Sequence, residues 1–386
     1  MAESPKTKNQ KPDKLQDPKF KSRNGILMFG PCWCFSGVWF LVFGVIALPS
    51  HGATLPPFAL LATNTSLIGA HRVVFLGDSI TYSGQYVDDV EAVLRADGLM
   101  GETEFLDLGL PSETVSGLSE SGHAGGKFPR PDLHERLGRV LAKTRPDLVI
   151  ACYGMNDGIY YPFGEERFQK FRDGILWLHV TVSVAGARIV HVTPPTFDPV
   201  PVKDHTLPAG LQEYRQPYEG YNEVLDRYSA WLLSQRTNGW QVVDVHSAMN
   251  DYLARRRKEA PGFVLARDGV HVDDTGHWII AKQLLRGLDA IPLGSKIDLE
   301  RFQDLAGGKL GTTLLKSIHE KNRLLSDAWL TDIGHKRPGM TQGLPIGDAR
   351  VKAAGLVLRI NEMARQFALQ LQAANTNAAA PAGRRP

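Results

Sequence analysis

Residues 72–81 read Arg-Val-Val-Phe-Leu-Gly-Asp-Ser-Ile-Thr, and this stretch decides the fold. Four apolar residues, 73–76, run directly into Gly77. A short apolar run bounded by a glycine is typical of a strand buried on both faces. Asp78 and Ser79, which follow, are residue types that form turns and cap helices. The stretch therefore predicts a buried strand that ends in a polar turn, the place at which open parallel sheets bind their ligands.

The same alternation of strand and helix continues along the chain. Further candidate strands lie at 103–108, 147–153, 187–193 and 240–245. Helical patterns lie at 85–96, 133–143, 166–184, 218–235 and 275–288. Alternation of this kind predicts an α/β fold in which a parallel sheet has helices on both faces.

The ends of the chain differ from this central part. Residues 54–70 are interpreted as a linker, 71–296 as the main domain and 297–372 as a helical extension. Two hypotheses for the extension stay open. Its helices shape the site, with His335, Lys336 and Arg337 binding an acidic group of the substrate, or it is a solvated appendage. Residues 373–386 lack apolar periodicity and are predicted to be disordered.

Composition excludes several classes of protein. The 386 residues include three cysteines, too few for a disulfide framework. The formal net charge is +3, but residues 1–24 hold seven Lys or Arg and only three Asp or Glu. Residues 25–53 hold no charged side chain, so the remainder of the chain carries a net charge of −1. The main domain therefore gives no electrostatic reason to expect a nucleic-acid partner.

The N-terminal 53 residues resemble a targeting segment. A basic stretch ends at Arg23 and an apolar run follows at 26–48, before a segment with the small residues Ser50, Gly52 and Ala53. This order is typical of an export signal, and the run is also long enough to span a bilayer. Basic residues on its N-terminal side favour a cytoplasmic start, so the rest of the chain is expected outside the cytoplasm. A cleaved signal and a retained membrane anchor both remain open.

A nucleophile and its base are found among the residues that follow the strands. The Ser79 hydroxyl is a weak nucleophile and needs a neighbouring base. His271 is the candidate base, and Asp268, three residues earlier, can orient its imidazole. The alternative for Ser79 is a helix cap, and for Asp268 and His271 a surface loop. His277 is the rival base, six residues beyond His271.

An attacked ester also needs donors for the negative charge that develops on its carbonyl oxygen. Three candidates follow successive strands: the backbone N–H groups of Ser79 and Gly109, and the side-chain amide of Asn156. Gly109 has no side chain to block an approaching substrate. The alternative for Asn156 is a turn cap.

Four short blocks together resemble the SGNH (GDSL-type) hydrolases. The blocks are Gly77-Asp78-Ser79-Ile80-Thr81, Gly109, Gly154-Met155-Asn156-Asp157 and Asp268-Gly269-Val270-His271. The resemblance implies a flavodoxin-like, three-layer α/β/α sandwich with a five-stranded parallel sheet. It also implies esterase activity without a metal or other cofactor, and a Ser79-His271-Asp268 triad. Ser79, Gly109 and Asn156 would then form the oxyanion hole.

The substrate is less closely defined. Tyr82, Tyr160 and Tyr161 are candidates for stacking on a sugar ring, with packing as the alternative. Together with export, they favour a serine esterase that removes acetyl groups from a carbohydrate. The alternatives are a lipase or thioesterase of the same family, acyl transfer to a sugar, and a non-catalytic carbohydrate-binding module at the cell surface.

Overall fold

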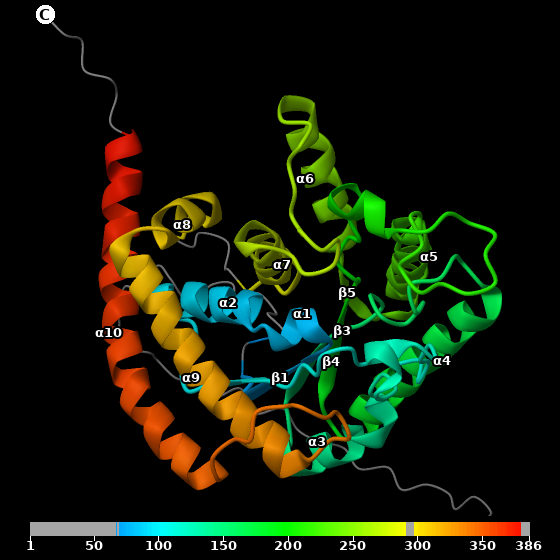
Figure 1. Ribbon diagram of the computed structural model, residues 1–386. Coiled ribbons are helices and arrows are strands. Elements are labelled where there is room, and N and C mark those ends of the chain that lie inside the picture. Colours follow the sequence, from blue (N-terminus) through cyan, green and yellow to red (C-terminus); the bar gives the residue numbers. More distant parts are fainter. Residues whose placement is uncertain (1–66, 68, 291–296, 380–386) are drawn as a thin grey trace, which may run out of the picture. The chain divides into compact units, whose positions relative to one another are not determined.

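The computed structural model describes residues 67, 69–290 and 297–379 (Figure 1). The expected targeting segment, nearly all of the linker and residues 380–386 lie outside this range. Within the described residues, no helix combines the length and apolarity needed to cross a membrane.

Five strands form one parallel sheet, as the sequence predicts. They are β1 (Arg72–Gly77), β2 (Glu104–Asp107), β3 (Leu148–Cys152), β4 (Arg188–Val192) and β5 (Gln241–Val243). Their order is β2-β1-β3-β4-β5, and each neighbouring pair is parallel. The strand order reverses at β1. The crevice beyond the carboxyl ends of β1 and β3 is therefore the expected ligand site.

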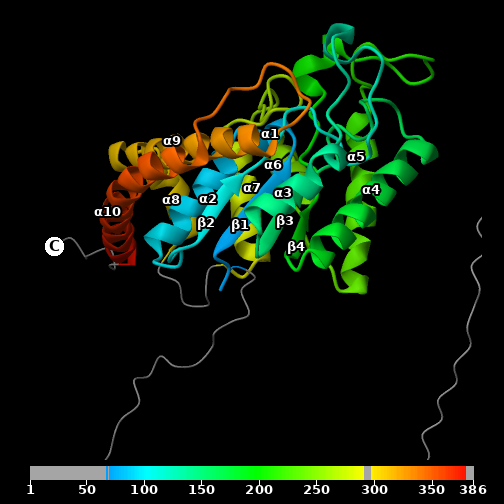
Figure 2. The ribbon, with the colours of Figure 1, turned by 90° about the horizontal axis from the view of Figure 1, so that it is seen from below.

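Helices cover both faces of the sheet and complete the three-layer sandwich (Figures 1 and 2). The face that carries α2 (Gln85–Ala96) also carries α7 (Asp274–Gly287). The opposite face is covered by α3 (Leu137–Thr144), α4 (Glu165–Val184) and α5 (Tyr221–Ser234). Short 3₁₀ helices lie in the connections, at His123–Gly126, Leu133–Glu135, Val200–His205 and Gln235–Asn238.

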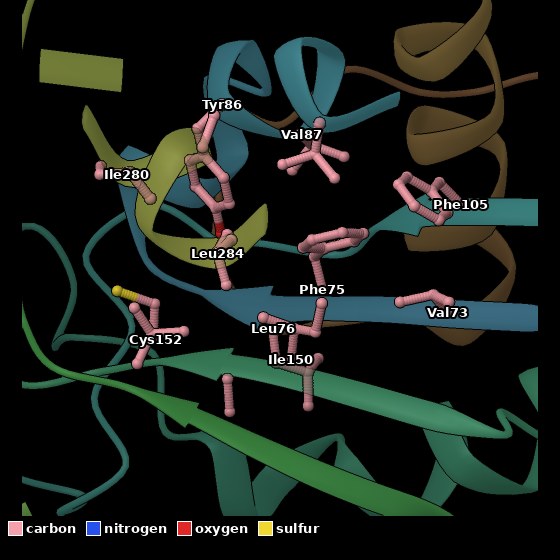
Figure 3. Close-up of a cluster of buried hydrophobic side chains, with 14 of the residues drawn as sticks. Val73, Phe75, Leu76, Tyr86, Val87, Phe105, Ile150, Cys152, Ile280 and Leu284 are labelled. Atoms are coloured by element: carbon pink, nitrogen blue, oxygen red, sulfur yellow. The ribbon is translucent and has the colours of Figure 1, made fainter. Parts of the chain in front are cut away.

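The core lies between the sheet and these helices, and Figure 3 shows its centre beneath α2 and α7. Phe75 of β1 packs edge-on against Phe105 of β2, with ring centroids 5.2 Å apart. Tyr86 of α2 covers the other side of Phe75 at 6.1 Å. All three side chains are almost completely buried. This packing fixes where β1 ends relative to α2 and β2, and with it the position of Gly77 and of the turn that follows.

Besides the four-residue α1 (Ser79–Tyr82), one helix of the main domain is absent from the sequence prediction. It is α6 (His246–Glu259), which connects β5 to the loop that carries Asp268. Only His246, Met249 and Leu253 of this helix are buried, and its last turns are strongly basic. So weak an apolar pattern does not identify a helix from sequence.

The C-terminal extension consists of α8 (Leu299–Ala306), α9 (Lys309–Ile333) and α10 (Ile346–Ala379). Helices α9 and α10 pack on each other, and α9 also packs on α2 and β2. Residues 373–379, expected to be disordered, are the end of α10. Four of these seven residues are Ala, the strongest helix former, which extends the helix beyond its apolar face.

Polar side chains join α9 to α2 in a buried layer. Lys321 Nζ lies 2.5 Å from Glu91 Oε1, and both side chains are almost fully buried. Asn322 Nδ2 donates to Asp88 Oδ1 at 2.8 Å. Because a buried charge costs free energy unless it is paired, these contacts with α9 stabilise the buried carboxylates of α2.

Candidate active site

The turn after β1 presents Ser79 at the start of the short helix α1 (Ser79–Tyr82). Asp78 caps this helix, and its Oδ1 accepts a hydrogen bond from the Ile80 N–H at 2.9 Å. Gly77 has no room for a side chain, because a β-carbon there would overlap Thr81 Oγ1 and lie 2.8 Å from the Cys152 carbonyl oxygen. The sequence Gly-Asp-Ser therefore permits a turn tight enough to hold Ser79 above the end of β1.

Ser79, His271 and Asp268 form a continuous chain of hydrogen bonds. Ser79 Oγ lies 2.7 Å from His271 Nε2. His271 Nδ1 lies 2.6 Å from Asp268 Oδ2. With Nδ1 donating to the carboxylate, Nε2 is left to accept from the serine hydroxyl. The His271 and Asp268 side chains are 52% and 56% exposed, so this arrangement opens to solvent.

Asp268 is held as a carboxylate by its own loop. Burial raises its pKa, but hydrogen bonds from the His271 side chain and from the Val270 and His271 N–H groups outweigh burial. The net result is a pKa below the usual aspartate value. A carboxylate that stays ionised can stabilise a protonated imidazole beside it.

The loop that carries Asp268 and His271 is anchored from two sides. Gly269 adopts a φ of +80°, and a β-carbon there would lie 2.8 Å from the Asp198 carbonyl oxygen. The Asp198 N–H donates to the Gly269 carbonyl at 2.8 Å. Arg257 of α6 in turn pairs with the Asp198 carboxylate at 2.5 Å. Residues after β4 and within α6 therefore set the position of His271.

The rival base, His277, lies elsewhere. Its Nε2 is 3.2 Å from Ser83 Oγ, and its ring stacks on Tyr86. Burial lowers its pKa to about 4. It is a neutral, buried imidazole that supports the end of α1.

Asn156 is oriented by two donors. Its Oδ1 accepts hydrogen bonds from Arg130 Nη1 at 2.9 Å and from the Tyr160 hydroxyl at 3.1 Å. Its Nδ2 consequently faces the other way, 3.3 Å from Asp78 Oδ2 and 3.3 Å from the Glu113 carbonyl oxygen. The amide N–H groups therefore point toward the residue that precedes Ser79.

Gly109, predicted to be an oxyanion donor, has a hydrogen-bond partner within the protein. Its N–H donates to Asp107 Oδ1 at 2.9 Å, so it is already engaged. A β-carbon at Gly109 would overlap the Tyr82 backbone nitrogen. The glycine is required because β2 and α1 approach so closely here. In this arrangement it presents no free donor to a substrate.

The turn after Gly109 was not singled out from the sequence. The Glu113 N–H donates to the Leu110 carbonyl at 3.0 Å, which closes a turn with Pro111 and Ser112 in its middle. Ser112 has a φ of +68°, a conformation that strains any residue except glycine. The Leu110 N–H donates to the Gly77 carbonyl oxygen at 2.9 Å, so one end of this turn lies next to the turn that carries Ser79. The other end lies next to Asn156, because the Glu113 carbonyl oxygen accepts from Asn156 Nδ2. A Pro followed by a turn-forming residue is its signal in the sequence.

The three candidate tyrosines have separate surroundings. Tyr160 follows Ile159 in a strained loop, with φ values of +59° and +49°, and bonds to Asn156. Tyr82 lies under the Arg323 guanidinium, whose carbon is 4.1 Å from the ring centre. Tyr161 packs beside Tyr214 with centroids 5.0 Å apart. Tyr160 is thus joined directly to the site, and the other two pack against neighbouring side chains.

Two ionic interactions missed by the sequence analysis lie behind Asn156. Glu120 receives two hydrogen bonds from Arg130, each 2.7 Å long. Glu113 pairs with Arg136 at 2.6 Å, and neither side chain is exposed. The partners are ten or more positions apart in the long connection between β2 and α3, so no local spacing predicts them. Among the described residues, no three His, Cys, Asp or Glu side chains gather as a metal site would require.

Comparisons with known proteins place this geometry in context. A family model described as the GDSL-like lipase/acylhydrolase family matches residues 75–279. No curated protein matched the chain. Among solved structures, an acetylxylan esterase from Geobacillus stearothermophilus is similar, with 22% identity, 56% of this chain and 94% of that chain covered, and a TM-score of 0.42.

Two other solved structures are similar to a comparable degree. One is an α/β hydrolase from the metagenome of Lake Arreo, Spain, with 20% identity, 57% and 95% coverage of this chain and that one, and a TM-score of 0.42. The other is a gut microbial diltiazem-metabolizing enzyme, with 20% identity, 57% and 47% coverage, and a TM-score of 0.41.

Proposed function

This chain belongs to the GDSL-like lipase/acylhydrolase family of ester-hydrolysing serine hydrolases, and from that premise we propose that Ser79, His271 and Asp268 are its catalytic triad. The observation that carries the proposal is the chain of short contacts, 2.7 Å from Ser79 Oγ to His271 and 2.6 Å from His271 to Asp268. A serine, its base and an orienting carboxylate in this order are what acyl transfer through a covalent intermediate needs.

The reaction follows from this arrangement. Ser79 Oγ attacks the ester carbonyl carbon while His271 Nε2 takes the hydroxyl proton. The alcohol leaves with that proton, and the acyl group stays on Ser79. A water molecule then gives a proton to His271 and attacks the acyl-enzyme, which releases the acid and restores the serine hydroxyl. The Asp268 carboxylate stabilises the charged imidazole in both steps.

The oxyanion is proposed to lie between the Ser79 N–H and Asn156 Nδ2. The two donors to Asn156 Oδ1 support this, because they turn the amide N–H groups toward the Asp78–Ser79 turn. Gly109 is less suited, since its N–H is held by the shorter bond, 2.9 Å to Asp107 Oδ1, whereas both contacts of Asn156 Nδ2 are 3.3 Å long. We assign the third position to the turn that contains Ser112, because Ser112 has a strained conformation and the next residue, Glu113, accepts a hydrogen bond from Asn156.

The proposed substrate is an O-acetylated carbohydrate outside the cytoplasm. The half-exposed His271 and Asp268 side chains support access by a bulky polymer. The order of charged, apolar and small residues in 1–53 supports export. Accessibility of the main domain to protease in intact cells tests export, and protection from the protease contradicts it.

The nucleophile is tested with the full chain and p-nitrophenyl acetate. Ser79→Ala is expected to lower kcat by at least about 10³-fold, because the covalent step is lost. Ser83→Ala is the matched control, since Ser83 lies one helical turn away and bonds to His277 instead. Activity that survives in Ser79→Ala would show that the triad assignment is wrong.

The substrate class is tested with the same variants on an acyl-length series and on acetylated polysaccharides. Release of acetate, confined to short acyl chains, is the expected result. Rates that rise with chain length would indicate a lipase or thioesterase instead. Transfer of acetate to an added sugar acceptor would indicate acyl transfer, and no turnover of any ester would favour a binding module.

A further inference from the structure

The loop between α9 and α10 brings Arg337 to the rim of the candidate active site. Arg337 Nε donates to the Pro111 carbonyl oxygen at 2.8 Å. Its guanidinium carbon lies 5.7 Å from the centre of the Phe128 ring. Figure 2 shows this loop reaching the end of the sheet at which α1 lies. A residue of the extension is thus held against the turn that contains Ser112.

The contacts of that turn connect Arg337 to the site. Pro111 and Glu113 are two residues apart, and the Glu113 carbonyl oxygen lies 3.3 Å from Asn156 Nδ2. On its other side, the turn is bonded to the Gly77 carbonyl through Leu110. Tyr82, at the end of the helix that Ser79 begins, contributes to the electrostatic surroundings of Arg337. The guanidinium is therefore bonded to the turn whose two ends contact Gly77 and Asn156.

The charge of Arg337 is uncompensated, unlike that of its neighbours. Arg130, Arg136 and Arg323 each pair with a carboxylate. Arg337 has no carboxylate partner among the described residues. Its Nη1 is bonded to the Pro338 carbonyl oxygen and to Met340 Sδ, and Nη2 has no acceptor there.

The surroundings of Arg337 disfavour its charge. Burial lowers the pKa of this half-buried guanidinium, and the nearby Tyr82 offsets burial only in part. Lys336, the preceding residue, is exposed and also lacks an ion-pair partner among the described residues. A partly buried arginine with a free N–H face is a favourable site for an oxyanion, which would supply the missing charge and acceptor.

We propose that Arg337 binds an anionic group, such as a carboxylate, on the alcohol part of the ester. The substrate class is then an acetyl ester of an acidic carbohydrate. This inference rests on the proposed function, because the anion must be bound while Ser79 attacks the same molecule. Nη2 contacts the anion, and the bond from Nε to Pro111 keeps the guanidinium at the site.

A matched pair of substrates tests the inference in the full chain. One is 4-acetoxybenzoate and the other is its methyl ester, which present the same acetyl group with and without a negative charge. Arg337→Gln is expected to lower the ratio of kcat/KM for the anion to that for the neutral ester by about tenfold, the scale of one charge-assisted hydrogen bond. The kcat/KM of the neutral ester should stay within about twofold of wild type.

Two further variants are the controls for Arg337→Gln. Arg359→Gln removes the same charge from the exposed side of α10 and should leave the ratio unchanged. Arg337→Lys keeps the positive charge, so it should retain part of the preference for the anionic ester. That preference should weaken as the salt concentration rises, nearly as much as in the wild type. An unchanged ratio in Arg337→Gln, or an equal loss on both esters, overturns the inference. Full activity in Ser79→Ala would instead overturn the proposed function.

Discussion

Arg130 donates a hydrogen bond from Nη1 to Asn156 Oδ1 across 2.9 Å, and this contact decides which end of the amide faces Ser79. Arg130 is itself fixed by two hydrogen bonds to Glu120 and by the Tyr160 ring, whose centre lies 5.3 Å from the guanidinium carbon. One of the two hydrogen bonds that orient Asn156 thus comes from outside the loop that carries it.

We expect Tyr160→Phe to lower kcat by about threefold to tenfold while KM stays nearly constant. The variant removes one of the two donors to Asn156 Oδ1 and keeps the aromatic ring. A hydrogen bond between neutral groups contributes about 1 kcal/mol, which corresponds to this factor. Steady-state kinetics with p-nitrophenyl acetate measures both constants.

Asn156→Ala is the reference for this prediction, with an expected loss of about 10²-fold to 10³-fold in kcat. In the double variant, Tyr160→Phe should cost almost nothing further, because it acts through Asn156. A rise in KM with kcat unchanged would show that the Tyr160 hydroxyl binds substrate instead.

We expect Glu113→Gln to lower the free energy of unfolding by about 3 kcal/mol or more. It leaves the Arg136 guanidinium charged and unpaired where neither side chain is exposed. It also weakens the acceptor of the Tyr153 hydroxyl, now 2.7 Å from Glu113 Oε2. Urea denaturation followed by circular dichroism measures the change.

The control for Glu113→Gln is Glu362→Gln, whose ion pair with Arg365 is exposed on α10. That pair should contribute less than about 0.5 kcal/mol. Equal effects of the two substitutions would contradict the difference in burial.

We expect Asp89→Asn to stabilise the protein at neutral pH by about 1 kcal/mol or more. Asp89 is 6% exposed and lines a cavity of about 580 Å³ between α2, α7, α8 and α9. Burial and the carboxylates of Asp88 and Asp274 raise its pKa well above 3.8, and no hydrogen-bond partner appears among the described residues. Removing an unpaired buried charge favours the folded state.

The sign of the pH dependence follows from that raised pKa. The folded protein holds a proton on Asp89 at pH values where the unfolded chain has lost it. Wild-type stability from this group therefore rises as the pH falls from the folded pKa toward 3.8. The advantage of Asp89→Asn should be largest above the folded pKa and disappear below about pH 3.8. Thermal unfolding from pH 4 to 8 checks this, and an advantage that grows on acidification would contradict it.

We expect Ser112→Gly to stabilise the protein by about 1 kcal/mol, because glycine adopts a φ of +68° without strain. Ser112→Ala removes the same hydroxyl but keeps the strain, so its effect should be near zero. Chemical denaturation of both variants separates the two causes. Equal stabilities would contradict a left-handed residue at this turn.

The sequence predicts the sheet, and also the contact between Asp268 and His271, because both depend on local signals. Each strand is centred on apolar residues, and Asp268 and His271 are close enough in the chain to bond within one loop. Helix α6 was missed because its surface is polar, and the end of α10 because its composition resembles a tail.

What the sequence does not predict is the hydrogen-bond partner of each polar atom. The N–H of Gly109 is occupied by a side chain two residues earlier, and Asn156 is oriented by Arg130 from a different loop. Such pairings depend on how the loops pack, and many pairings are compatible with the same residues. Tyr160, expected to stack on a sugar, has its hydroxyl bonded to Asn156 for the same reason.

The buried pair between Lys321 and Glu91 has a consequence for where the protein can be cut. The match to the family ends at residue 279, but Glu91 of α2, within that match, pairs both with Arg95 of its own helix and with Lys321 of α9. A chain shortened at the end of α7 would remove Lys321 and Asn322 from Glu91 and expose the side of α2 that α9 covers. Limited proteolysis should therefore yield no stable fragment that lacks α9, and the smallest cooperative folding unit is larger than the family's common core.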